Sequence, residues 1–97
     1  MAAYLIADIT ITDPAGFEEY RRQVAPTIAA FGGKYLVRGG KTEPLEGNWN
    51  PKRFVIIEFE SAARAREWYH SDAYRPAMAL RHKSAQVNLL LVEGVSP

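Results

Sequence analysis

The sequence predicts an α+β fold of the ferredoxin-like kind, in which four antiparallel strands carry helices on one face. Two observations predict it. Four segments alternate apolar and polar side chains with the period of a strand: residues 4–11, 34–38, 53–59 and 86–93. Between the first pair and between the last pair, apolar residues recur at spacings of three and four, as in an amphipathic helix. The resulting order is β-α-β-β-α-β within a single domain, residues 1–97.

The first helix is predicted from its ends and from its apolar stripe. Asp13 is a typical N-cap residue, and Pro14 suits the first helical position because its ring already has a helical φ angle. The stripe consists of Phe17, Tyr20, Val24, Ile28 and Phe31. Pro26 lies inside the helix and removes one backbone hydrogen bond, so we expect a kink or a break near Ala25. The glycine pair at 32–33 then ends the helix.

A long loop separates the two central strand segments. Residues 41–52 contain two prolines, one glycine and two asparagines, and a hairpin loop of about a dozen residues tends to be functional or mobile. Ser61 is the expected N-cap of a helix over residues 62–71, and the Ser-Asp pair at 71–72 is expected to start a second, short helix. Residues 94–97 form the tail.

The composition argues against several classes of protein. Twelve Lys and Arg residues oppose eleven Asp and Glu, and a net charge of +1 gives no reason to expect a nucleic acid or an anionic membrane as partner. No run approaches the ~20 apolar residues of a membrane helix, and the first residues lack the basic segment of a signal peptide. The sequence has no cysteine, which excludes disulfides and suits a cytoplasmic location.

Both faces of the predicted sheet are apolar. We assign to the helix side the more apolar sets, which are Leu5, Ala7, Ile9, Ile11, Tyr35, Val37, Val55, Ile57, Phe59, Val87, Leu89 and Leu91. The opposite side, called the outer face below, then holds Tyr4, Ile6, Asp8, Thr10, Lys34, Leu36, Arg38, Phe54, Ile56, Glu58, Gln86, Asn88, Leu90 and Val92. So many large apolar groups on one surface mark an interface. The sequence therefore predicts a homodimer packed sheet to sheet about a twofold axis.

Several motifs resemble one family over nearly the whole chain. They are GGKYLVRGG at 32–40, LEGNW at 45–49, PKRFVIIEF at 51–59, Ala65 with Trp68, Tyr69, Ser71 and Tyr74, then Arg81, and Val-Glu-Gly at 92–94. Together they resemble the domain of unknown function 1330 family, a member of the dimeric α/β-barrel superfamily. The resemblance implies a ferredoxin-like subunit and a homodimer. Neighbouring families in that superfamily include cofactor-free monooxygenases, haem-degrading enzymes, lactone isomerases and stress-response dimers, while the family itself has no established activity.

Polar side chains of the outer face form a first candidate site. Each strand contributes one of them, and the set is Asp8, Arg38, Glu58 and Asn88. Charges need partners if this face is buried, because an unpaired buried ion is costly. One interpretation is a structural ion-pair network that fixes the strand register and the dimer geometry. The other is a polar cavity in which Glu58 or Asp8 takes a proton and Arg38 binds both oxygens of a carboxylate.

The two ends of the long loop offer a second candidate. Residues 38–40 (Arg-Gly-Gly), with 46–47 (Glu-Gly) and Arg53, are either a strand end with a tight turn or a rim that meets an anion. Nothing here matches a phosphate-binding glycine loop. Trp49 either packs on a partner subunit, as tryptophans often do at interfaces, or covers a pocket.

Aromatic residues of the helices are a third candidate. The set is Tyr20, Trp68, Tyr69, His70 and Tyr74. Aromatic residues at helical spacing usually belong to the core, although Tyr69 and Tyr74 are placed to turn hydroxyls into a cleft between helices and sheet. His70 is able to shuttle protons near neutral pH, while a lone histidine on a helix more often faces solvent. Because His70 and His82 lack metal-binding spacing, we predict no metal site.

Three functions remain open at this stage. The first is a small enzyme with isomerase- or monooxygenase-like chemistry, acting on a small organic acid, a lactone or an aromatic compound without a tightly held cofactor. Glu58 or His70 would transfer the proton, and Arg38 or Arg53 would anchor the substrate. The second is a ligand-binding or stress-associated dimer without turnover, and the third is a purely structural dimer. The candidate binding residues are Arg38, Arg53, Tyr69, Tyr74, Asp8 and Trp49, and the site is expected near Arg38, Arg53, Glu58 and Tyr69.

Overall fold

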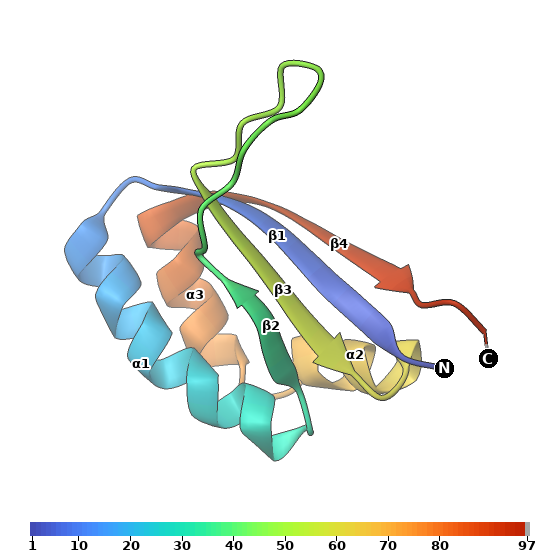
Figure 1. The fold of residues 1–97 in the computed structure, drawn as a ribbon. Helices are drawn as coiled ribbons and strands as arrows, with labels where there is room; N and C mark the ends of the chain where they lie inside the picture. The colour runs from blue at the N-terminus through green and yellow to red at the C-terminus, as the bar shows by residue number, and fades with distance from the viewer. Residues whose placement is uncertain (97) are drawn as a thin grey trace.

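The computed structural model describes residues 1–96 and confirms the α+β architecture (Figure 1). Its elements in chain order are β1 (Ala3–Ile11), α1 (Pro14–Ala30), β2 (Lys34–Arg38), β3 (Arg53–Phe59), α2 (Ala62–Tyr69), α3 (Arg75–Ser84) and β4 (Ala85–Glu93). The second helical part is divided into α2 and α3, in keeping with the second helix start predicted after residue 70. Pro97, the last residue of the predicted tail, lies outside the described residues.

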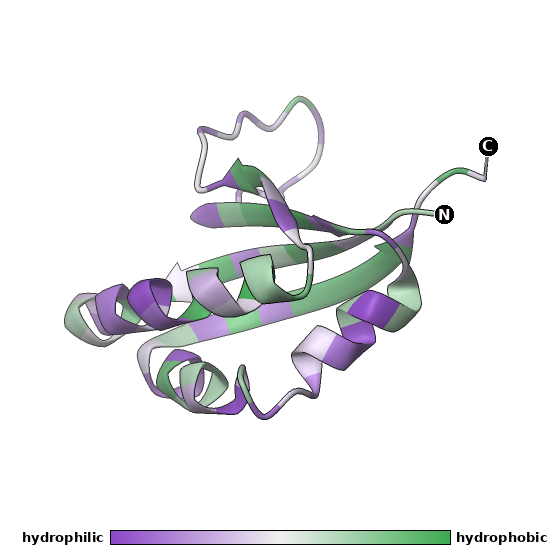
Figure 2. Ribbon diagram, turned by 90° about the horizontal axis from the view of Figure 1, so that it is seen from below, coloured by the Kyte–Doolittle hydropathy of each residue, from purple (hydrophilic) through white to green (hydrophobic). Residues whose placement is uncertain are grey.

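The four strands form one antiparallel sheet in the order β2-β3-β1-β4 (Figure 1). Strand β1 is central, so that Leu5 lies between Ile57 of β3 and Leu91 of β4. All three helices cover the same face of this sheet, and the other face has no helix over it (Figure 2). The alternation predicted for β1 is confirmed, because Leu5, Ala7 and Ile9 are buried on the helix side.

Helix α1 begins and ends as the sequence predicts. The Asp13 side chain accepts a hydrogen bond of 3.3 Å from the backbone N–H of Gly16, and Pro14 occupies the first turn. At the other end Gly32 has a φ of +77°, a left-handed conformation that glycine adopts without strain.

Of the kink or break predicted near Ala25, the break is wrong, because α1 runs unbroken through Pro26 to Ala30. Proline removes only one hydrogen bond from the helix ladder. Val24 and Ile28, on either side of Pro26, are buried against the core. Their burial holds these turns of the helix in place, since tertiary packing contributes most of the stability of helices in proteins.

A short turn joins α2 to α3 and is held by serine. The Ser61 hydroxyl accepts a hydrogen bond from the backbone N–H of Arg64 (3.1 Å) and caps α2 as predicted. In the turn that follows α2, the Ser71 hydroxyl accepts a hydrogen bond from the backbone N–H of Tyr74 (3.1 Å). This turn aims the Tyr74 side chain into the core, where only 1% of the residue is exposed.

Aromatic rings fill the core between the sheet and the helices. The Trp68 ring lies 4.0 Å from the Tyr74 ring and 5.7 Å from the Phe59 ring, measured between centroids. Its Nε1 donates a hydrogen bond of 3.0 Å to the Thr27 hydroxyl, which satisfies the indole and joins α2 to α1. Loss of such a buried side chain to alanine typically costs about 3–5 kcal/mol.

A β-bulge in β2 decides which side chains of this strand face the helices. The pairing with β3 passes from Tyr35 to Val37, so that Leu36 is an extra residue in the strand. Arg38 then lies opposite Val55 and faces the helices, while Val37 faces outward. The sides predicted for Val37 and Arg38 are therefore wrong, because one extra residue moves every following side chain to the other face.

The outer face remains apolar and exposed in the single chain. Its exposed large residues include Leu36, Leu90 and Val92. The loop between β2 and β3 extends beyond the end of the sheet (Figure 1). Trp49 of this loop donates a hydrogen bond of 2.9 Å from Nε1 to the Asp8 carboxylate, and its ring lies 5.6 Å from that of Phe54. The loop is thereby attached to the outer face.

Candidate functional site: an arginine-rich pocket between helices and sheet

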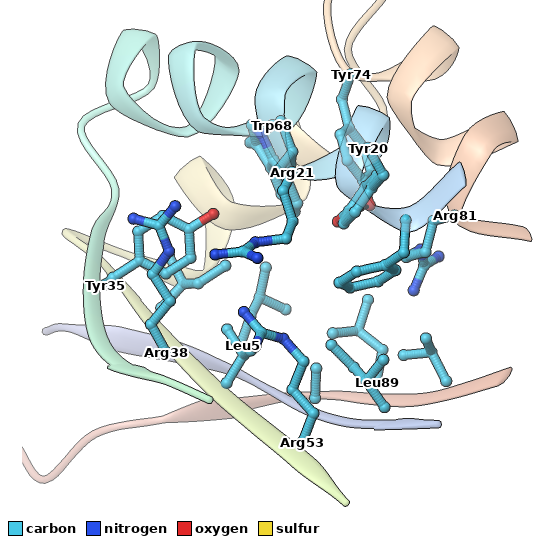
Figure 3. Close-up of a pocket in the computed structure, with 17 residues that line it drawn as sticks. Leu5, Tyr20, Arg21, Tyr35, Arg38, Arg53, Trp68, Tyr74, Arg81 and Leu89 are labelled. Atoms are coloured by element: carbon cyan, nitrogen blue, oxygen red, sulfur yellow. Dashed lines mark hydrogen bonds between the residues drawn. The ribbon is translucent and has the colours of Figure 1, made fainter. Parts of the chain in front are cut away.

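A pocket lies between the helices and the covered face of the sheet (Figure 3). Counted with its open mouth, the hollow measures about 600 Å³, and the room inside it for water is about 50 Å³. The floor is apolar and consists of Leu5, Ala7, Val55, Ile57 and Leu89. An apolar pocket with a few polar groups at its edge is typical of small-molecule sites.

Four arginines reach this pocket from four different elements. They are Arg21 from α1, Arg38 from β2, Arg53 from β3 and Arg81 from α3 (Figure 3). Among the described residues that line the pocket, none is an aspartate, a glutamate or a histidine. Positive charges gathered on an apolar floor repel each other and lose hydration, which is unfavourable without a counter-charge. The arrangement therefore favours the binding of an anion.

Arg53 lies at the centre of this positive charge. Burial lowers the pKa of Arg53 below its usual value, and the charges of Arg21 and Arg38 lower that pKa further. Its guanidinium also lies 5.7 Å from the centroid of the Phe17 ring. The Nε atoms of Arg53 and Arg21 are buried without a hydrogen-bond partner within residues 1–96. A bound anion would supply the missing acceptors and favour the charged form of Arg53.

Arg38 and Arg21, the other two arginines at the mouth, make few hydrogen bonds with the described residues. The Arg38 guanidinium lies over the ring of Tyr35, with 4.6 Å between Cζ and the ring centroid. Arg21 forms a salt bridge of 3.1 Å with Glu18, and both side chains are well exposed there, so this pair contributes little to stability. Burial raises the pKa of Tyr35, although Arg38 lowers it, and the Tyr35 phenol is thus a hydrogen-bond donor at neutral pH.

Two tyrosine hydroxyls meet at the buried end of the pocket. The hydroxyl oxygens of Tyr20 and Tyr74 are 3.2 Å apart, and either one is able to donate to the other. Burial raises the pKa of both phenols, and the proximity of Tyr74 raises the pKa of Tyr20 further. Both therefore remain protonated at neutral pH and act as hydrogen-bond donors rather than as bases.

The pocket contains only part of the predicted site. The predicted binding residues that line it are Arg38, Arg53 and Tyr74, and Tyr20 and Trp68 of the aromatic candidate set line it as well. Glu58 lies on the outer face, across the sheet from the pocket, and His70 is exposed at the end of α2. Tyr69 is half-buried and lines a separate hollow with Ala65 and Leu91. None of the three residues predicted to take or transfer a proton, Asp8, Glu58 and His70, is thus among the described residues that line the pocket.

The predicted outer-face group of four polar residues does not come together. Asp8 and Asn88 are direct cross-strand neighbours, and Asp8 accepts the hydrogen bond from Trp49. Glu58 lies four residues further along the neighbouring strand than the partner of Asp8. Arg38 is on the opposite side of the sheet because of the bulge.

Sequence reasoning missed two of the four arginines. Arg21 is not among the predicted candidates, and Arg81 enters the sequence analysis only as part of the family motif, whereas only 6% of Arg81 is exposed. A signal was present in the helical spacing. Arg81 follows Tyr74 and Ala77 at intervals of three and four, along the buried side of α3. An arginine at such a position is rare in protein interiors and indicates a polar partner or a ligand.

Neither a metal-binding cluster nor a membrane-spanning helix is found among the described residues. Within residues 1–96, no group of three or more His, Cys, Asp or Glu residues is arranged to hold a metal ion. No helix among those described is both long enough and apolar enough to cross a membrane.

The fold places the chain among ferredoxin-like α+β proteins, with one antiparallel sheet and its helices on one side. Within that class the chain belongs to the family described as domain of unknown function (DUF1330), whose family model matches residues 2–95. This confirms the resemblance found in the sequence motifs. No curated protein matches the sequence significantly.

Solved structures show the same fold at low identity. The chain is similar to RPA0582, a protein of unknown function from Rhodopseudomonas palustris, with a TM-score of 0.81, 18% identity, and coverage of 99% of this chain and 84% of that chain. It is similar to SnoaB, a cofactor-independent oxygenase from Streptomyces nogalater, with a TM-score of 0.70, 14% identity, and coverage of 99% and 95%. A conserved protein from Methanosarcina mazei has a TM-score of 0.52 at 16% identity, with coverage of 93% and 91%. These identities establish a common fold and no common activity.

Proposed function

We propose that this protein binds a small organic acid with an apolar body in the pocket between the helices and the sheet. Arg38 and Arg53 hold its carboxylate, with Arg21 at the rim. The observation that carries this proposal is the convergence of three guanidinium groups at the mouth, with no acidic residue among the described lining residues. A planar guanidinium matches a carboxylate in shape and charge.

The enclosed space of the pocket limits the size of the ligand. The room for water inside is about 50 Å³, enough for a few water molecules, whereas the whole hollow measures about 600 Å³. The long side chains of Arg21, Arg38 and Arg53 line the mouth, and the enclosed space alone is too small for the body of an organic acid. Entry of a ligand body therefore requires these side chains to swing outward and to close again on its carboxylate.

Catalysis on the bound acid is a second candidate function. The likeness in fold to SnoaB, a cofactor-independent oxygenase, favours it. The phenols of Tyr20, Tyr35 and Tyr74 would donate hydrogen bonds to an oxyanion that forms on the ligand. Binding without turnover has the stronger support, because no carboxylate or imidazole is among the described residues that line the pocket to serve as a general base.

A thermal-shift panel tests the binding proposal. It compares aliphatic and aromatic carboxylic acids with their primary amides, which keep the shape and lose the charge. We expect stabilisation by acids alone, and we expect Arg53→Met to abolish it. Arg22→Met is the matched control, because Arg22 neighbours Arg21 in the sequence but is exposed and paired with Glu19. Equal stabilisation by acids and amides would refute the proposal, and product formation seen by mass spectrometry would add the catalytic function to it.

We also propose that two copies of the chain pack through their outer faces. The face carries large apolar residues that remain well exposed in the single chain, including Leu36, Leu90 and Val92. Exposed apolar patches of this extent mark association surfaces, and a stable interface buries about 1,600 Å² in total. The extended loop adds Trp49 and Leu45, which are also exposed and suit contact with the second copy.

A further inference from the structure

The buried end of the pocket contains a charge that the carboxylate site at the mouth does not use. Only 6% of Arg81 is exposed. Its Nε is buried and has no hydrogen-bond partner in the described part of the chain. Within residues 1–96 its one side-chain hydrogen bond is a long one, 3.4 Å from Nη2 to Nε2 of His82. Burial of a guanidinium without a counter-charge is unfavourable, so this residue needs an explanation beyond packing.

The tyrosine pair next to Arg81 has a free donor. The hydroxyls of Tyr20 and Tyr74 are 3.2 Å apart, and each hydroxyl has one hydrogen to donate. One hydrogen forms the bond between the two tyrosines, and the other has no acceptor among residues 1–96. Arg81, Tyr20 and Tyr74 line the same pocket. The positive charge of Arg81 lowers the pKa of both phenols, in opposition to burial. A guanidinium and a phenol hydrogen are therefore available to a ligand in this pocket.

This group is separate from the arginines at the mouth. The charges of Arg21 and Arg38 are the ones that lower the pKa of Arg53, whereas Arg81 acts on the two tyrosines. Figure 3 shows Arg81 on one side of the pocket and Arg38 on the other. The Phe17 ring lies near both groups, with its centroid 5.7 Å from the Arg53 guanidinium and 5.3 Å from the Tyr20 ring centroid. The pocket therefore has positive charge at both ends and an apolar middle.

From this arrangement we propose that the ligand is a small organic acid with a second acidic oxygen at its far end. The carboxylate binds at Arg38 and Arg53, and the second oxygen, from a phenol, an enol or a second carboxyl group, binds at Arg81 and the Tyr20–Tyr74 pair. This inference rests on the proposed function and narrows it to bifunctional acids. All three kinds of second group share one chemistry, an oxygen that accepts hydrogen bonds and carries negative charge on ionisation.

Isothermal titration calorimetry with matched probes tests this proposal on the intact protein. The first pair is phenylacetate and 4-hydroxyphenylacetate, and the second is hexanoate and adipate, which adds a second carboxylate to the chain. We expect the bifunctional member of at least one pair to bind about tenfold more tightly, in keeping with one added charge-assisted hydrogen bond. The preferred pair tells whether a phenol or a carboxyl group is the natural second group.

Variants at the buried end separate this proposal from the binding proposal on which it rests. Tyr20→Phe and Arg81→Gln should each reduce the preference for the bifunctional acid severalfold, whereas Arg53→Met should weaken both members of a pair. Lys83→Gln, an exposed change two residues from Arg81, is the control and should leave the preference intact. If Arg81→Gln does not fold, Tyr20→Phe decides the question, because it keeps the shape of the ring.

The possible outcomes are distinct. Equal affinity within both pairs, together with loss of binding in Arg53→Met, overturns the bifunctional ligand and leaves the carboxylate site intact. A preference that survives Tyr20→Phe and Arg81→Gln also overturns it, since the second group then binds elsewhere. Absence of binding by all four acids refutes the proposed function itself.

Discussion

Gly39 lies directly beneath the guanidinium of Arg53. A Cβ atom built on Gly39 would be 2.4 Å from Nη1 of Arg53, closer than atoms in real structures approach. Gly39 also has a φ of +73°, and its backbone N–H donates a hydrogen bond of 2.8 Å to the Phe54 carbonyl. The glycine after β2 therefore gives Arg53 the space that it occupies at the mouth of the pocket.

A substitution at this glycine should damage both the fold and the site. Gly39→Ala introduces a strained φ, which costs about 1–2 kcal/mol, and displaces the Arg53 side chain. Gly47→Ala is the matched control, because Gly47 has a similar φ of +80° and open space where a Cβ would lie. We expect urea denaturation to show a loss for both variants, and acid binding to fall only for Gly39→Ala. Equal acid binding by the two variants would show that Arg53 does not need this space.

The bulge in β2 leads to a prediction about Arg38 that strict alternation of side chains along the strand would not give. With Arg38 on the helix side, Arg38→Met should weaken the binding of a carboxylic acid about tenfold or more, as expected for lost hydrogen bonds to a charged group. Calorimetry measures the affinity, and sedimentation measures the oligomeric state. An altered oligomeric state with unchanged acid affinity would place Arg38 on the outer face after all.

Alkaline pH should destabilise the protein through its buried phenols. The pKa values of Tyr20, Tyr35 and Tyr74 are raised in the folded state. A raised folded pKa gives stability that is present below the unfolded value, about 10 for tyrosine, and that is lost as the pH rises above it. We therefore expect the free energy of unfolding to fall as the pH rises above about 10, and to fall less steeply in Tyr20→Phe. Denaturant titrations over this range measure it, and an unchanged slope in Tyr20→Phe would argue against burial of that hydroxyl.

A charge placed in the middle of the outer face should prevent the proposed association. Ile56 is half-buried on this face in β3, and Ile56→Glu would bury a carboxylate without a partner between two sheets. Analytical ultracentrifugation should show a dimer for the wild type and a monomer for Ile56→Glu. Ala63→Glu, on the exposed side of α2, is the control and should remain dimeric. A wild-type monomer at low micromolar concentration contradicts the proposed dimer.

Local patterns in the sequence predicted the framework well where a residue has one strong physical preference. Asp13 with Pro14 predicted the start of α1, and the alternation of β1 predicted its buried side, because caps and half-buried strands leave clear signatures. Pro26 does not break the helix, because the burial of its neighbours outweighs the cost of the lost hydrogen bond and of the crowded proline ring.

The site was harder to predict than the fold. The extra residue Leu36 has no signature in a run of strand formers, yet it moves Arg38 from one face to the other. Glu58 and His70 are chemically suited to proton transfer, but their positions on the outer face and at the end of α2 keep them from the pocket. Arg81 begins a run of polar residues at the end of α3, and only the packing of α3 against the core buries it.

A crystal structure of the protein with a bound carboxylic acid tests the account most directly. It should show the carboxylate within hydrogen-bond distance of both Arg38 and Arg53, with the body of the acid on the floor formed by Leu5 and Ile57. An acid bound on the outer face, or a carboxylate in the pocket that contacts neither arginine, would contradict the account.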